Sequence, residues 1–223
     1  MKKKNLFALL MTSILLILAG CSSQDNTSSK KVQITSTPTL FFHGGGSSYH
    51  AEEHMVNAAK KAGVTTSVIR MVGHSLGNIS IIYYMLQNGN KKNMPQIQKQ
   101  VDIAGHFAGL DFDGIPNSIK QPKGMKLNSN GKPNKMNSTY KQMTEVRSIY
   151  AKKHVKVLNI IGDIGNGSDG RVDNKSSLSL QYLVGDGNST YRILKINGKN
   201  AQHSKLHENV QVDKALIKFL WNK

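Results

Sequence analysis

Gly73, Ser75 and Gly77 form a Gly-x-Ser-x-Gly pattern, the spacing that presents a serine as a nucleophile. Residues 65–72 before it are β-branched and apolar, which predicts a buried strand, and residues 78–87 after it are typical of a helix. The turn between such elements is tight, so residues that flank the serine must be small. The helix N-terminus would stabilise developing negative charge. We therefore interpret Ser75 as a nucleophile.

A serine hydroxyl attacks only when a base takes its proton. In a sheet-and-helix fold of this kind the chain order is serine, acid, histidine. His203 follows the predicted strand 191–196 and is our candidate base. His207 is the alternative, although it lies at the approach to a helix for which Asn209 is a natural N-cap.

Two aspartates follow the predicted strand 155–161 and could orient the base. Asp163 lies almost on the strand, where it could simply turn the chain. Asp169 begins an Asp-x-x-Val pattern, in which Val172 would pin the loop while the carboxylate points inward. We favour Asp169, which would hold one imidazole tautomer and stabilise the imidazolium.

The oxyanion of acyl transfer needs backbone N–H donors. The amide of Leu76, directly after the nucleophile, is one candidate. The predicted strand 39–42 ends in a His-Gly-Gly-Gly run, and the amide of Gly45 in that run is the second candidate.

His50, Glu53 and His54 match the H-x-x-E-H pattern of inverted zincins, which is the competing chemistry. Zinc would need a third protein ligand, and the sequence places none clearly. We interpret this segment as a solvated helix face and expect neither a metal nor an organic cofactor.

Predicted strands alternate with predicted helices, which favours a mainly parallel sheet covered by helices on both faces. Residues 110–137 are polar and aperiodic, which indicates a lid-like excursion. The predicted strands are 39–42, 65–72, 101–105, 155–161 and 191–196, and the predicted helices are 50–61, 78–87, 138–150, 176–183 and 212–220.

The N-terminal region has the features of a bacterial lipoprotein leader. Three lysines precede an apolar stretch at residues 6–18, which is too short to span a bilayer and predicts a signal peptide at 1–20. Cys21 follows Leu-Ala-Gly, as in the lipobox whose cysteine is lipidated. Residues 21–36 would be a flexible tether, and residues 37–223 the folded domain.

The formal net charge is +17, and Cys21 is the single cysteine, so no disulfide forms within the chain. A lipid anchor on a basic body favours an anionic membrane surface outside the cytoplasm. The lysines are scattered and no nucleic-acid motif occurs, so we expect no nucleic-acid partner.

Beyond the serine motif, four segments are similar to a family of bacterial α/β-hydrolases described as membrane-bound cell-surface hydrolases. The resemblance covers residues 38–221 and implies an α/β-hydrolase fold with a triad at Ser75, Asp169 and His203. It does not imply a particular physiological substrate; from the site itself we expect carboxylic esters, with thioesters or amides as further options. The segments are Val-Asp-Ile-Ala-Gly-His-Phe at 101–107, Ser-Asp-Gly-Arg-Val at 168–172, His-Ser-Lys-Leu-His-Glu-Asn at 203–209 and Phe-Leu-Trp at 219–221.

The chain departs from this family before the nucleophile strand. Family members carry an additional strand, loop and helix there, whereas here residues 66–70 run directly into residues 71–75. One helix, 50–61, must then link two parallel strands. Such crossovers are right-handed in about 98% of cases, so the helix must either switch faces or form a left-handed crossover. A shortened lipoprotein without catalysis is the alternative function.

The lipobox makes a direct prediction. The mature protein should partition into detergent and incorporate a fatty-acid probe at Cys21. Cys21→Ser should leave the protein uncleaved or released, because the thiol is the acceptor of the lipid. Metabolic labelling followed by detergent partition measures both, and wild-type protein without label would refute the lipid anchor.

Overall fold

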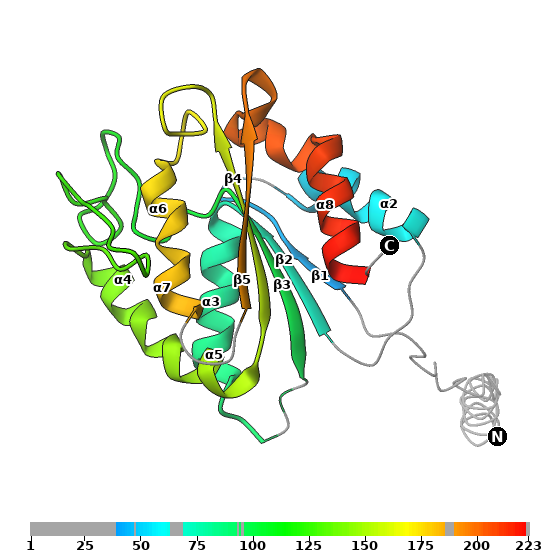
Figure 1. Ribbon diagram of the computed structural model, residues 1–223, viewed down its shortest axis with the longest axis horizontal. Helices are drawn as coiled ribbons and strands as arrows, with labels where there is room; N and C mark the ends of the chain where they lie inside the picture. Colours follow the sequence, from blue (N-terminus) through cyan, green and yellow to red (C-terminus); the bar gives the residue numbers. More distant parts are fainter. Residues whose placement is uncertain are drawn as a thin grey trace, which may run out of the picture. The chain divides into compact units, whose positions relative to one another are not determined.

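A parallel sheet of five strands organises the domain (Figure 1). The computed structural model describes residues 39–46, 48–62, 69–92, 94, 96–185 and 190–221, all within a compact unit, Thr35–Lys223. All four strand pairs are parallel, and the order in the sheet is the order in the sequence. The strands are β1 (Thr39–Phe42), β2 (Ile69–His74), β3 (Ile97–Ile103), β4 (Lys156–Asp163) and β5 (Thr190–Asn197).

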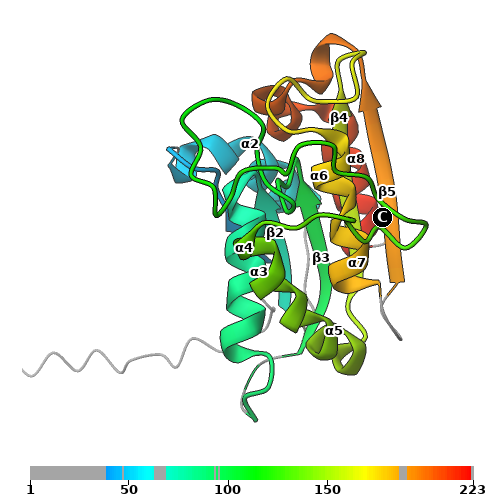
Figure 2. The ribbon, with the colours of Figure 1, turned by 90° about the vertical axis from the view of Figure 1, so that its left-hand side faces the viewer.

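Helices cover both faces of this sheet, as the alternating pattern predicts (Figure 2). One face packs against α3, α5 and α7, and the other against α2 and α8. The α-helices are α2 (Glu53–Ala62), α3 (Leu76–Asn88), α4 (Ser138–Met143), α5 (Arg147–Lys153), α6 (Asn174–Leu178), α7 (Leu180–Val184) and α8 (Val210–Trp221). Short 3-10 helices are η2 (Tyr49–Glu52), η3 (Thr144–Val146), η4 (Lys199–Ala201) and η5 (His203–Glu208).

Successive strand residues supply two separate apolar cores. On β2, Met71 joins the core under α3, whereas Val72 joins the core under α8. This alternation follows from the two-residue period of a strand. Because both neighbours are apolar and buried, β2 reads in the sequence as a continuous apolar run, which is typical of a parallel sheet covered on both sides.

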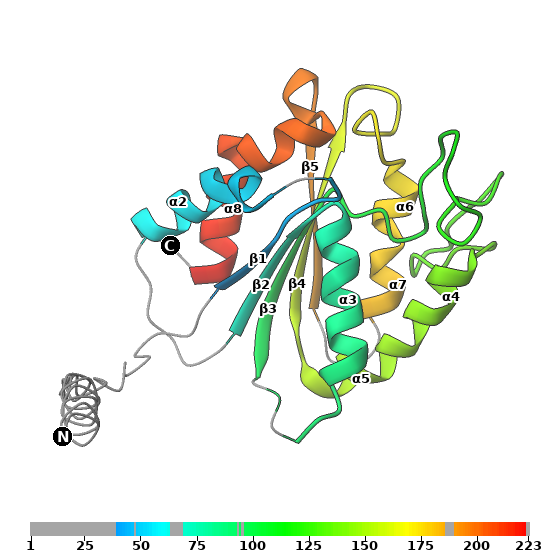
Figure 3. The ribbon, with the colours of Figure 1, turned by 180° about the vertical axis from the view of Figure 1, so that it is seen from behind.

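The crossover from β1 to β2 has the opposite hand to the other three. The strands advance in one direction, but α2 lies on the α8 face while the helices of the later crossovers lie on the other face (Figure 3). Three consecutive crossovers of one hand are the right-handed ones that the chirality rule predicts. The α2 crossover is therefore left-handed, which is the first of the two arrangements that the sequence allows.

The remaining elements differ from the sequence predictions mainly at their ends. β3 begins four residues earlier than predicted, and the predicted helices 138–150 and 176–183 are each interrupted by 3-10 turns or a break. The predicted residues 65–68 of the nucleophile strand lie outside the described residues, as do 1–36, where the leader and tether were predicted. Within the described part of the chain, every helix is too short or too polar to cross a bilayer.

The excursion at 110–137 contains no regular helix or strand, as predicted. Isolated bridges pair Leu110 with Lys120 and Leu127 with Pro133. Two contacts attach this region and its base to α6. Ser176 Oγ donates a hydrogen bond to the carbonyl of Gly109, and Gln121 Nε2 donates one to Asp173.

β3 also carries an ionisable group inside the core. Asp102 is fully buried, and both its carboxylate oxygens accept from Gln100 Nε2 at 2.9 Å. Tyr150 donates its hydroxyl to Gln100 in turn. Burial raises the pKa of Asp102 to about 7, against a smaller lowering by the Gln100 hydrogen bond. In the unfolded chain the Asp102 carboxyl ionises at a much lower pH than it does in the fold. The free energy of unfolding therefore falls as pH rises from about 4 to 7.

Asp102→Asn should therefore stabilise the domain at pH 8, because it removes the cost of a buried charge. The gain should be of the order of 3 kcal/mol, which would raise the melting temperature by several degrees. At pH 4 the difference should disappear. Thermal unfolding at both pH values measures it, with the exposed Asp111→Asn as control. A lower melting temperature of Asp102→Asn at pH 8 would contradict this assignment.

Candidate active site

Ser75 occupies a strained turn between β2 and α3. Its backbone has φ 53° and ψ −118°, a conformation that L-residues rarely adopt. A Cβ on Gly73 would overlap the side chain of Asn78, and one on Gly77 would overlap the carbonyl group of Phe42. The two glycines are therefore required by space, as the sequence analysis expects.

Asn78 holds this turn against the end of β3. The Ser75 amide donates to the Ile103 carbonyl at 2.9 Å. Asn78, which is fully buried, donates from Nδ2 to the carbonyls of both Ile103 and Ser75, at 2.8 and 3.1 Å. Three hydrogen bonds thus fix the strained backbone, and the energy of the strain is offset by the surrounding structure.

The structure brings Ser75, His203 and Asp169 together in one chain of hydrogen bonds. Nε2 of His203 lies 2.9 Å from Oγ of Ser75, and its Nδ1 lies 2.8 Å from Oδ2 of Asp169. A carboxylate can only accept, so Nδ1 carries the hydrogen and Nε2 presents a lone pair to the serine. This is the arrangement of a nucleophile, a base and an orienting acid.

Asp169 is immobilised by its own loop. Its Oδ1 accepts from the amides of Arg171 and Val172 at 2.9 and 2.7 Å, which leaves Oδ2 for the histidine. Val172 is 1% exposed and anchors the loop in the core. The Asp169 carbonyl also accepts from the His203 amide at 2.9 Å. The buried Val172 and the two amides thus fix the direction of the Asp169 carboxylate, which points to His203.

The two alternative residues have other partners. Asp163 forms an ion pair with Lys195 and accepts hydrogen bonds from the amides of Gly165 and Gly167. These contacts lower the pKa of Asp163 to about 2, and the hydrogen bond from Lys195 has the largest effect. His207 is buried with its ring edge against His74, 4.6 Å between centroids. Neither residue is hydrogen bonded to Ser75 or His203 within the described residues.

His74, the variable residue of the serine motif, contacts His203, the candidate base. Its Nε2 donates to the carbonyl of His203 at 3.0 Å, and the two rings lie 4.9 Å apart. Burial, with smaller contributions from His203 and His207, lowers the pKa of His74 to about 3. His74 is therefore neutral at physiological pH and a dependable donor. The sequence analysis missed this role, although a histidine inside the motif was its visible signal.

The two oxyanion candidates also lie together. Leu76 is the first residue of α3, so no carbonyl within the helix can accept from its amide. Gly45 lies beside it, since a Cβ on Gly45 would sit 3.3 Å from Leu76 Cδ2. Gly44 approaches Ser75 in the same way, at 3.2 Å from its Cβ. The glycine run after β1 therefore lies directly over the serine.

The H-x-x-E-H segment is divided between η2 and α2. His50 pairs with Glu53 and His54 with Asp213, so the two histidines have different carboxylate partners. Among the described residues, no group of three His, Cys, Asp or Glu side chains is arranged to hold a metal ion. The prediction of a solvated face is wrong for Glu52, which is 3% exposed and whose pKa burial raises to about 7.

A second histidine that the sequence analysis did not single out lies near the triad. His106 follows the sharp turn after β3, where Ala104 has φ 52°. It is 7% exposed, and its pKa is lowered to about 4 by burial and, secondarily, by His203. His106 is therefore a neutral ring at physiological pH.

The chain is similar to solved structures of low sequence identity. The product of the gene lin2722 from Listeria innocua aligns with a TM-score of 0.66 at 18% identity, over 84% of this chain and 95% of that one. A carboxyl esterase 2 from Tuber melanosporum aligns at 13% identity and a TM-score of 0.47, over 85% and 78%. The hydrolase olei00960 from Oleispira antarctica aligns at 10% identity and a TM-score of 0.49, over 84% and 92%. The first of these likenesses supports the fold.

No curated protein matches the chain significantly. A family model does, in two segments, residues 26–71 and 67–223. The segments meet where the sequence analysis places the missing strand, loop and helix. Because together they span far more than half of the sequence, the chain belongs to the family described as alpha/beta hydrolase of unknown function (DUF915).

Proposed function

We propose that this protein is a serine hydrolase that cleaves carboxylic esters through an acyl-enzyme on Ser75. The single observation that carries the proposal is the hydrogen-bonded series from Ser75 through His203 to Asp169. Both contacts are within the reach that proton transfer requires. Membership of an alpha/beta hydrolase family supports the same reaction class.

In the proposed acylation, Oγ of Ser75 attacks the carbonyl carbon of the ester while its proton passes to Nε2 of His203. Asp169 stabilises the imidazolium, and the amides of Leu76 and Gly45 would bind the oxyanion. Collapse of the tetrahedral intermediate breaks the bond between the carbonyl carbon and the alcohol oxygen. The alcohol leaves with the proton from His203. Water then attacks the acyl-enzyme, with His203 again as the base, and releases a carboxylic acid.

Exposed apolar side chains around the triad favour esters with an apolar acyl or alcohol part. Leu76 follows Ser75 directly, and Ile164 Cδ1 would lie 3.5 Å from a Cβ on Gly170, next to Asp169. The ring of Phe112, on the excursion, lies 6.0 Å from the guanidinium of Arg171. These three side chains are 38–44% exposed, so an apolar ligand that covered them would be stabilised by the removal of this surface from water.

The proposed location is outside the cytoplasmic membrane, with the domain tethered by a lipid on Cys21. The cysteine and its tether lie outside the described residues, so the lipobox motif alone supports this part. A lipid ester within reach of the tether would then be a suitable substrate.

A lipoprotein without catalytic activity is the second candidate. The left-handed crossover of α2 favours it, because this arrangement is rare in folded proteins. Reaction with an activity-based probe distinguishes the two candidates.

A fluorophosphonate probe should label the wild-type protein at Ser75, and Ser75→Ala should abolish labelling. Hydrolysis of p-nitrophenyl butyrate should fall by at least about 10³-fold, since the nucleophile and its partners act as a unit. Ser80→Ala is the matched control, because Ser80 is an exposed serine on the same helix. An unlabelled wild type that melts cooperatively would favour the inactive lipoprotein.

The acid and the base should be separable from their neighbours. Asp169→Asn and His203→Ala should each lower kcat roughly 10³-fold or more, because the base loses its orientation or is absent. Asp163→Asn and His207→Ala should stay within about tenfold of wild type, since neither touches Ser75. Steady-state kinetics with circular dichroism checks both sets, and a reversed ranking would move the triad to the other pair.

A further inference from the structure

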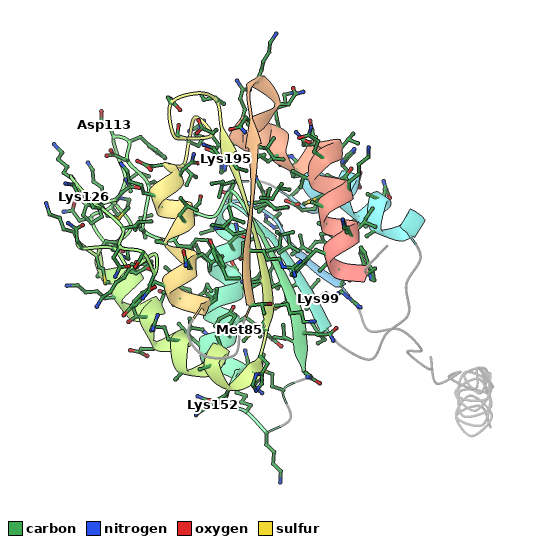
Figure 4. The ribbon with its side chains drawn as sticks, viewed as in Figure 1. Met85, Lys99, Asp113, Lys126, Lys152 and Lys195 are labelled. Carbon is green, nitrogen blue, oxygen red and sulfur yellow. The ribbon has the colours of Figure 1, made fainter. Side chains whose placement is uncertain are left out.

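A groove of about 650 Å³ lies between α8 and the first residues of β4 and β5. It lies at the opposite end of the sheet from the triad. Ser75 and Asp169 come after the C-terminal ends of β2 and β4, whereas the groove is lined by residues near the N-terminal ends of β4 and β5. Figure 4 labels Lys99 beside the end of α8, and Lys195 towards the far end of β5. The lining residues are Lys99, Lys156, Leu158, Thr190, Arg192, Ile193, Leu194, Ala215, Lys218 and Phe219.

A row of cations crosses three strands at this end of the sheet. Arg70 on β2 is the register partner of Lys99 on β3, and Lys99 is the partner of Lys156 on β4. Residues in register on parallel strands share a face, so the three side chains lie side by side. Like charges directly opposite one another are destabilising. The sheet therefore holds an electrostatic cost that an anion would relieve.

Backbone carbonyls at the C-terminal end of α8 accept hydrogen bonds from two of these three cations. Arg70 Nε donates to the Leu220 carbonyl at 3.0 Å, and Lys99 Nζ donates to the carbonyls of Phe219 and Leu220 at 2.7 and 3.0 Å. The helix C-terminus also favours positive charge. Burial lowers the pKa of Lys99, and the neighbouring Arg70 and Lys156 lower it further. Both cations thus have helix carbonyls as acceptors, and Lys99 also lines the groove.

The other three cations of the groove are exposed at its rim. Lys156, Arg192 and Lys218 come from β4, β5 and α8, and the ten lining residues include no aspartate or glutamate. Leu194 and Phe219 are partly buried against the core and supply apolar surface between the charges. Ile193 points to the opposite face of β5, because it is in register with Asn159, whereas Leu194 is in register with Ile160 of the core under α8. The groove therefore combines positive charge with a partly exposed apolar strip, which Leu194 and Phe219 form.

We propose that this groove binds a single-chain amphiphile with an anionic head group, such as an alkyl carboxylate or an alkyl phosphate. The head group would lie at Lys156, Arg192 and Lys218, where charge-assisted hydrogen bonds are strongest. The alkyl chain would cover the apolar strip of Leu194 and Phe219. The volume is within the range of small-ligand sites. The proposal does not depend on the triad.

Isothermal titration calorimetry tests the proposal with laurate and with monododecyl phosphate, each below its critical micelle concentration. Both should bind in a 1:1 ratio, and the tighter of the two identifies the preferred head group. Dodecyl maltoside, which lacks the charge, and acetate and inorganic phosphate, which lack the chain, should bind at least about tenfold more weakly.

The double variant Lys156→Gln/Arg192→Gln should weaken binding of the preferred amphiphile at least about tenfold, because two charged contacts are lost. Leu194→Thr introduces a β-branched residue, which strands favour, and should weaken binding about threefold, because it removes apolar surface from the groove. The matched control is Lys126→Gln/Lys152→Gln, which removes two exposed lysines outside the groove and should leave binding unchanged. Ser75→Ala should bind as the wild type does, whether or not the protein is an esterase.

Melting curves without ligand check that each variant folds. Equal weakening by the control pair would overturn the proposal, because it would indicate a general charge effect. Equal binding of dodecyl maltoside would overturn it as well, since no anion would be recognised. So would binding to phosphatidylglycerol vesicles without binding to either monomeric amphiphile, which would indicate attraction to a charged surface.

Discussion

The candidate site depends on one close approach, that of Gly77 on α3 to the carbonyl of Phe42 at the end of β1. This contact leaves no space for a side chain, and it places the glycine run after β1 over Ser75. It requires β1 to pair directly with β2. When a single helix has to join those strands, and that helix packs beside α8, the crossover can only be left-handed. The rare hand of α2 is thus a consequence of keeping the two sides of the site together.

Histidines supply a second layer of organisation behind the triad. His74 contacts His203 through its backbone and ring, and His207 supports His74 from the other side. Burial keeps His74 uncharged, so the group that positions the base does not compete with it for protons. The base is consequently held from two directions, by a carboxylate at Nδ1 and by a neutral imidazole at its carbonyl.

The sequence was sufficient for the fold class and for the residues that meet at the site. The turn at Ser75 requires small residues at fixed positions on both sides, so a short sequence pattern reveals it. Asp169 is recognisable as well, because the apolar Val172 three residues later indicates a loop that is anchored in the core. The histidine inside the serine motif is visible in the sequence, but the partner of His74 is not, because it is a backbone carbonyl 129 residues away. The early start of β3 was missed because Lys99 and Gln100 find partners only in the folded protein. The cation row requires strand register, which no single segment encodes.

Neighbours in the sheet are neighbours in the sequence, and this has a kinetic consequence. Short-range pairing of β1 to β2, and then of each strand to the next, allows the sheet to grow in the order in which the chain is synthesised. The contact of His203 with Ser75 is different, because 128 residues separate the two. Most of the sheet can therefore assemble before His203 arrives. Until the segment with His203 has docked, a growing chain holds a strained Ser75 whose hydroxyl lacks the imidazole as its hydrogen-bond partner.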